Sequence, residues 1–149
     1  MTELPRDTVM GVTTPLAPGE ALLQTWRGDA RVYLAATVRL AAILALGVGV
    51  VLYAIGNGDI LVGALGAVLA IGARGWFLAS EALAFEWRLT DRRLLGPGGK
   101  EAALPDITRL RMLFGDVQVV TRQGDKHLIR HMARPQAVIA AIESAKARR

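Results

Sequence analysis

LAAILALGVGVVLYAI-GNGD-ILVGALGAVLAIGA, from Leu40 to Ala73, is the stretch that decides the fold of this chain. Two apolar runs, residues 40–55 and 60–73, are separated only by the four residues GNGD, and neither run contains a charge. As helices they would rise about 24 and 21 Å, at roughly 1.5 Å per residue. Apolar continuations over residues 32–38 and 75–80 extend each run toward the ~30 Å hydrocarbon core of a bilayer. A buried hairpin in a soluble protein is the alternative, and we favour a transmembrane hairpin.

The charges around this hairpin predict its orientation. Arginines flank both outer ends, whereas the connecting loop offers only Asp59. By the positive-inside rule, both termini should be cytoplasmic, at the inner membrane of a bacterium. Five aromatic residues fall on that same side, where amphipathic rings belong at a headgroup boundary. The arginines are Arg27, Arg31, Arg39, Arg74, Arg88, Arg92 and Arg93, and the aromatic residues are Trp26, Tyr33, Trp76, Phe77 and Trp87.

Small residues recur at intervals of four along both helices. Such spacing lets helix backbones approach closely in lipid, where apolar side chains have no reason to prefer one another. The ridges either pack the two helices of the hairpin together or dock another chain, and the second helix has two of them. The residues are Ala41, Ala45 and Gly49 in the first helix, and the pairs Gly63 and Ala67, and Gly66 and Ala70, in the second.

The composition and charge of the chain limit its function classes. The chain has 149 residues, of which 52% are hydrophobic, and no cysteine, so thiol chemistry and Cys-based metal sites are excluded. Residues 85–149 carry 13 Lys and Arg against 7 Asp and Glu. This basic tail indicates either attraction to anionic headgroups or simple obedience to the positive-inside rule.

The pattern after residue 84 changes from helical to alternating, which is typical of half-buried strands. Turn signals at Gly96–Gly99, at Gly115-Asp116 and at residues 123–125 separate the strands. Pro135 suits the first turn of a closing helix that presents Val138, Ala141, Ile142 and Ala145 on one side. Expected strands are residues 85–90, 93–95, 102–104, 107–114, 117–121 and 127–132. We therefore expect three parts: an N-terminal cytoplasmic segment (1–30), the two-helix hairpin (31–84) and a small cytoplasmic α+β domain (85–149).

Several motifs of this tail are similar to those of a known family. Residues 87–94, WRLTDRRL, resemble the aromatic-x-Leu-Thr-x-x-Arg-Leu signature of the bacterial pleckstrin-homology-like, membrane-flanked family. LPDI (104–107), GDVQV (115–119), the segment 134–142 and Pro18-Gly19-Glu20 resemble further family features. The resemblance implies a PH-like roll of antiparallel sheet capped by a C-terminal helix. It implies no catalytic residue, since the family's members are mostly of unknown function.

No motif for catalysis or for a cofactor is visible. The sequence has no phosphate-binding glycine loop, Ser-His-Asp arrangement or His-Glu-x-x-His helix. His127 and His131 could share a metal on a helix, but on a strand they stand about 13 Å apart. Asp91, in the Thr90–Arg92 stretch, is expected to bond to local backbone as part of a turn. We therefore expect no enzyme activity, no cofactor and no metal.

Arg109, Arg111 and Arg130 form the most interesting charged group. The first two share a face of one expected strand, and the third belongs to a later strand that could pair nearby. They are either an ordinary solvated face or a surface for acidic headgroups or an acidic partner. Nucleic acid fits poorly, because the patch is small and lacks aromatic residues on which bases would stack.

Together these observations predict a non-enzymatic, membrane-anchored PH-like binding or scaffold module that faces the cytoplasm. The alternative is an accessory or assembly subunit of a larger inner-membrane complex. The expected partners are the lipid bilayer, anionic headgroups, and another membrane protein or a second copy of the chain.

Overall fold

The computed structural model describes residues 6–7, 11–12 and 14–148. It divides into two compact units. One comprises Met1–Asp29 together with Glu81–Arg149, and the other comprises Ala30–Ser80. Each is described by itself.

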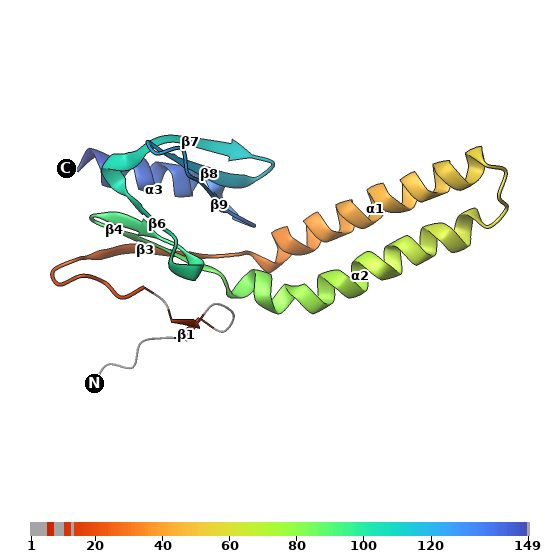
Figure 1. Cartoon of the computed structure of the whole chain (residues 1–149), viewed down its shortest axis with the longest axis horizontal. Coiled ribbons are helices and arrows are strands. Elements are labelled where there is room, and N and C mark those ends of the chain that lie inside the picture. The colour runs from red at the N-terminus through yellow and green to blue at the C-terminus, as the bar shows by residue number, and fades with distance from the viewer. Residues whose placement is uncertain (1–5, 8–10, 13, 149) are drawn as a thin grey trace. The chain divides into compact units, whose positions relative to one another are not determined.

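The two apolar runs form a helical hairpin (Figure 1). Helix α1 spans Ala30–Ala54 and α2 spans Ile60–Ala84, each 25 residues long. At 1.5 Å per residue each measures about 37 Å, which exceeds the ~30 Å hydrocarbon thickness. Both helices are long and apolar enough to cross a membrane, and in these two helices only Ala41 and Gly75 are buried. Gly56, with a positive φ of 71°, ends α1 in the left-handed conformation that favours glycine.

Four antiparallel strands form the first sheet of the other unit, in the order β3-β4-β5-β6. They are β3 (Leu22–Arg27), β4 (Glu86–Thr90), β5 (Arg93–Leu95) and β6 (Glu101–Ala103). Short 3₁₀ turns, Pro97–Gly99 and Leu104–Asp106, flank β6. A separate two-stranded pair joins β1 (Arg6–Asp7) to β2 (Gly11–Val12).

The second sheet has the order β7-β8-β9, with β7 at Ile107–Leu113, β8 at Asp116–Thr121 and β9 at Lys126–Ile129. Helix α3, Pro135–Ala147, lies against β7 and β8 (Figure 1). Its buried side, Val138, Ile142 and Ala145, carries three of the four residues expected there, and Ala141 is half-buried. The core between the sheets and α3 is built from fully buried aliphatic residues: Leu89, Leu94, Leu104, Ile107, Val117, Val119, Ile129 and Ile142.

Strand β3 changes the expected division of the chain at residue 30. Its register with β4 pairs Trp26 with Trp87 and Arg27 with Glu86, across the whole hairpin. Residues 22–27 are therefore part of the same sheet as the tail and not of a separate N-terminal segment. The sequence hides this because the partner strand lies some 60 residues away. The pairing also requires both outer ends of the hairpin to lie on the same side of any membrane that it spans.

Candidate functional site

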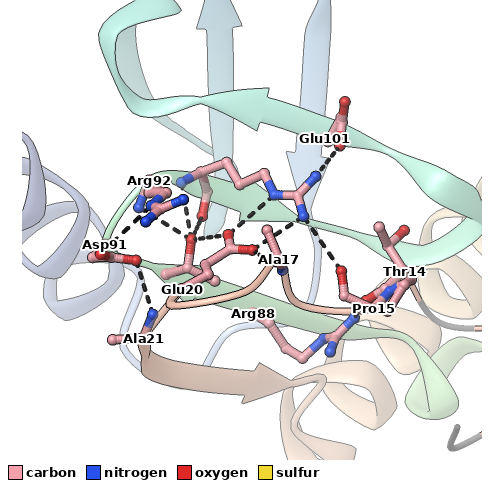
Figure 2. Close-up of polar contacts among 11 residues, drawn as sticks. Thr14, Pro15, Ala17, Glu20, Ala21, Arg88, Asp91, Arg92 and Glu101 are labelled. Atoms are coloured by element: carbon pink, nitrogen blue, oxygen red, sulfur yellow. Dashed lines mark hydrogen bonds and ion pairs between the residues drawn. The ribbon is translucent and has the colours of Figure 1, made fainter.

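A buried polar cluster links the segment before the hairpin to the strand turn after it (Figure 2). Gly19, with φ of 73°, makes the turn that places Glu20, whose side chain is fully buried. Arg93 donates hydrogen bonds to both carboxylate oxygens of Glu20, with Nε 3.0 Å from Oε1 and Nη2 3.1 Å from Oε2. The Thr90 hydroxyl donates to Oε1 at 2.6 Å, and the Ala17 amide donates to Oε2 at 2.7 Å. Every carboxylate oxygen is thus satisfied.

This cluster is a structural clamp. The hydrogen bond from Arg93 above all, followed by those from Thr90 and Ala17, outweighs burial and holds the pKa of Glu20 at about 2, against an ordinary 4.5. The hydrogen bond with Glu20 in turn raises the pKa of Arg93. A carboxylate so fully bonded and so acidic is poorly suited to proton transfer near neutral pH. The residues of the Leu-Thr-x-x-Arg motif therefore have a structural explanation.

Asp91 differs from its expected role as a local turn former. Its Oδ1 accepts a hydrogen bond from the Ala21 amide at 3.0 Å, and its own amide donates to the Ala21 carbonyl. The local turn bonds belong to Thr90, whose hydroxyl accepts from the amides of Arg92 and Arg93. The turn that contains Asp91 is therefore also hydrogen-bonded to the segment around Ala21.

A cavity of about 360 Å³ beside Trp87 is the strongest candidate for a binding site. We call it the Trp87 cavity. It combines apolar side chains with three cations, and none of the described residues that line it is a carboxylate. Its lining residues are Gly28, Ala82, Phe85, Trp87, Pro97, Lys100, Lys126, Leu128, Arg130 and Met132.

A glycine loop shapes one wall of the Trp87 cavity. The Trp87 ring lies directly on Gly96, where an added Cβ would be 2.6 Å from two ring carbons. On another side Trp87 faces His127, with ring centroids 6.2 Å apart. The Gly96 amide donates to the Lys100 carbonyl at 2.7 Å and closes the loop that brings Lys100 to the cavity. The predicted Gly96–Gly99 turn is therefore part of the candidate site.

The cations of the Trp87 cavity are available to a ligand. Lys100, Lys126 and Arg130 are exposed, and none of them forms an ion pair within residues 14–148. Gly28 lies two residues before α1, and Ala82 lies in the last turn of α2. The lining of the cavity therefore includes one residue close to the start of α1 and one at the end of α2.

The structure separates the three arginines that the sequence analysis considered together as either a solvated face or a binding surface. Arg130 lines the Trp87 cavity, whereas Arg109 and Arg111 do not. Both lie exposed on β7, where Arg109 pairs with Val120 of β8 and, through it, with Lys126 of β9. Neighbouring strands are about 4.8 Å apart, so Arg109 and Lys126 share one sheet face roughly 10 Å apart. Sequence reasoning missed Lys100 and Lys126, because no local pattern connects Lys100, which precedes β6, with Lys126 at the start of β9.

The small-residue ridges of the hairpin also divide. Ala41 is buried, and Ala45, Gly49, Gly63 and Ala67 are half-buried between the helices. A Cβ on Gly63 would lie 3.1 Å from the Val48 side chain of α1, whereas one on Gly66 would meet nothing within 4 Å. Gly66 and Ala70 are exposed. The prediction missed Gly75, which is buried against Thr37 and whose carbonyl accepts a hydrogen bond from the Tyr33 hydroxyl at 2.8 Å.

The two histidines lie apart in the structure of the tail. His127 belongs to β9, whereas His131 lies beyond the end of that strand with a φ of 57°. Within the described part of the chain, no three His, Asp or Glu side chains are placed to hold a metal ion. Comparison with protein-family models, with curated proteins and with solved structures finds no match to this chain in any of the three.

Proposed function

We propose that this chain is a non-enzymatic, membrane-anchored binding module whose Trp87 cavity takes a phosphate-bearing amphiphile. The observation that carries the proposal is the composition of the cavity: among residues 14–148, it is lined by three cations that form no ion pair and by apolar side chains, without a carboxylate. Lys100, Lys126 and Arg130 would bind the anionic group through charge-assisted hydrogen bonds. Phe85, Trp87 and Met132 would contact the apolar portion.

The size and place of the Trp87 cavity support this ligand class. Its volume of about 360 Å³ is at the small end of ligand sites. Gly28 and Ala82, which line it, are within a few residues of the membrane helices. An anionic headgroup of the adjoining leaflet would reach such a site without leaving the bilayer, and Lys or Arg near an anionic surface gains about 1 kcal/mol.

The proposed setting is the cytoplasmic face of a bacterial inner membrane. The arginines at both outer ends of the hairpin favour that side. The unit with the cavity would then be a PH-like domain. Its two antiparallel sheets and closing α3 are compatible with the roll that the sequence resemblance implies.

Native mass spectrometry of the full chain in detergent micelles would test the proposal. Phosphatidylglycerol should remain bound where phosphatidylcholine does not. Changing Lys100, Lys126 and Arg130 together to alanine should weaken phosphatidylglycerol binding by about two decades, at about 1 kcal/mol per cation and 1.4 kcal/mol per decade. Titration calorimetry with glycerol phosphate and with inorganic phosphate distinguishes a lipid headgroup from a soluble phosphate source.

The matched control removes two cations outside the cavity, Arg109 and Arg111. This double variant should bind phosphatidylglycerol within a few-fold of the wild type. Equal loss in the control and the triple variant would show that general basic charge, and not the cavity, attracts the lipid. Binding that survives in the triple variant would exclude the cavity as the site.

A second candidate function is that of an accessory or assembly subunit in a larger membrane complex. An apolar groove of about 530 Å³ in the hairpin favours it, because small and large apolar residues together line the groove. The lining residues are Ala45, Leu46, Gly49, Val50, Tyr53, Ile60 and Ala64. Gentle-detergent purification with mass spectrometry separates the two functions. A stoichiometric second chain supports the subunit, and the chain alone or as a homo-oligomer supports the module.

A further inference from the structure

The turn between β7 and β8 presents an apolar tip. Met112, Leu113 and Phe114 are adjacent in sequence and are 52%, 44% and 96% exposed. In water, three neighbouring apolar side chains at the end of a hairpin are an unfavourable surface, and such exposed patches commonly mark an interaction site. We call these three residues, which belong to the β7–β8 hairpin and not to the helical hairpin, the hairpin tip.

Turn chemistry does not explain the aromatic residue in the hairpin tip. The two-residue turn is Phe114-Gly115, and both residues have positive φ, 51° and 91°. Turns of this kind strongly favour Asn, Asp or Gly at the first position, because a bulky L-residue is strained there. An almost fully exposed phenylalanine in a strained backbone conformation gains nothing from packing within the chain. Strain of this kind is typical of functional positions.

A hydrogen-bonded path connects the hairpin tip to the start of the membrane helices. Leu113 pairs across the turn with Asp116, whose Oδ1 accepts from the His131 amide at 2.9 Å. The His131 carbonyl in turn accepts from the Asp29 amide at 2.7 Å. Asp29 immediately precedes the first residue of α1. Two hydrogen bonds thus separate the turn from the chain's first entry into the apolar helix.

The end of α2 also lies close to the residues that precede α1. A Cβ on Gly28 would lie 3.6 Å from the His131 Cβ and 3.4 Å from the Leu83 side chain near the end of α2. Gly28, just before α1, therefore lies close both to His131 and to the end of α2. Within its own unit, the turn between β7 and β8 therefore lies close to residues 28, 29 and 83, which adjoin the apolar helices in the chain.

We propose that the hairpin tip inserts into the headgroup and upper acyl region of the bilayer, as a wedge that holds the cytoplasmic unit against the membrane. Phe114 supplies the largest apolar surface. The inference goes beyond the Trp87 cavity and requires only that the hairpin spans a bilayer.

The chain's lack of cysteine makes a direct depth measurement feasible. A nitroxide is attached at Leu113→Cys in the full chain, reconstituted in nanodiscs that contain phosphatidylglycerol. The matched control is Gln123→Cys, an exposed residue of the opposite turn, between β8 and β9. The ratio of collision rates with oxygen and with an aqueous nickel chelate reports depth. We expect this ratio to be several-fold higher at residue 113 than at residue 123.

A second variant separates insertion from folding. Phe114→Asn suits a positive φ, so it should preserve or raise thermal stability while it removes the wedge. The oxygen-to-nickel ratio at residue 113 should then fall toward that of residue 123. A label at residue 113 that is as accessible to nickel as the control overturns the proposal. A label shielded from both reagents also overturns it, because protein and not lipid would then cover the tip.

Discussion

The hairpin and the sheet-containing unit are stable for opposite reasons. In α1 and α2 only Ala41 and Gly75 are buried, although both helices are strongly apolar. In the other unit, a core of leucines, isoleucines and valines is fully buried, and the buried polar cluster is completely hydrogen-bonded. The comparison teaches that hydrophobicity alone does not locate a core. A residue such as Leu61 is 84% exposed in the hairpin, as expected if lipid would take the place of a protein core there.

The strongest test of this contrast is an all-or-none one. If lipid is the solvent of the hairpin, cysteines at Asn57 and at Gln123 should lie on opposite sides of the membrane. In intact cells, an impermeant thiol reagent should label Asn57→Cys, and it should reach Gln123→Cys only after membrane disruption. The reverse pattern would invert the orientation, and equal labelling of both sites would contradict a spanning hairpin.

The buried cluster offers the next largest effect. Because the pKa of Glu20 falls from 4.5 to about 2 on folding, its stabilising contribution is complete above about pH 4.5 and is lost as the pH falls toward 2. A difference of about 2.5 units corresponds to roughly 3 kcal/mol. Glu20→Gln should therefore destabilise the unit by about this amount at pH 7 and flatten the acid dependence between pH 4.5 and 2. Urea unfolding of the full chain in nanodiscs, followed by tryptophan fluorescence, measures both.

The matched control for Glu20 is Glu101→Gln. Glu101 also binds Arg93, at 2.7 Å, but its side chain is 56% exposed. An exposed ion pair contributes between 0 and about 1 kcal/mol, so this variant should change stability little. Equal effects of the two substitutions would contradict the clamp.

Substitutions in the helical hairpin should change stability less than those in the clamp. The two glycine ridges, represented by Gly63 and Gly66, should differ in how much stability a leucine costs. Gly63→Leu must separate the helices, because Val48 and Leu52 of α1 occupy the space. Overpacking of this kind costs about 1–3 kcal/mol. Gly66→Leu should stay within about 0.5 kcal/mol, since the site is open. The distance between spin labels at Leu44→Cys and Ala70→Cys should lengthen only in Gly63→Leu. An effect confined to Gly66→Leu would place a second chain on the exposed ridge.

Local patterns in the sequence predicted the local elements well. Residues 93–95 form the expected strand, and Pro135 begins the expected helix. Alternation or helical periodicity within a few residues is enough to predict such elements. The predicted strand at residues 127–132 ends earlier, at Ile129, because His131 takes the left-handed conformation beside the Gly28–Asp29 junction.

Features that depend on distant partners were not predictable in the same way. The clamp joins Glu20 to Arg93 over 73 residues, so the Gly-Glu dipeptide was visible but its role was not. The Trp87 cavity likewise brings Lys100, which precedes β6, together with Lys126 and Arg130 at the two ends of β9. Only the folded sheets bring them together. Among the three predicted arginines, one therefore lies at the candidate site by tertiary placement and two remain on an open strand.

The pairing of β3 with β4 has a consequence for how the molecule is made. Arg27 meets Glu86 across 59 residues, so β3 leaves the ribosome long before its partner strand exists. Until the second helix has crossed back, β3 is an unpaired edge, and edges of this kind are prone to wrong pairing. A chain that inserted only one helix would leave the two strands in different compartments. If the hairpin spans a membrane, this sheet can therefore be completed only after both helices have crossed it.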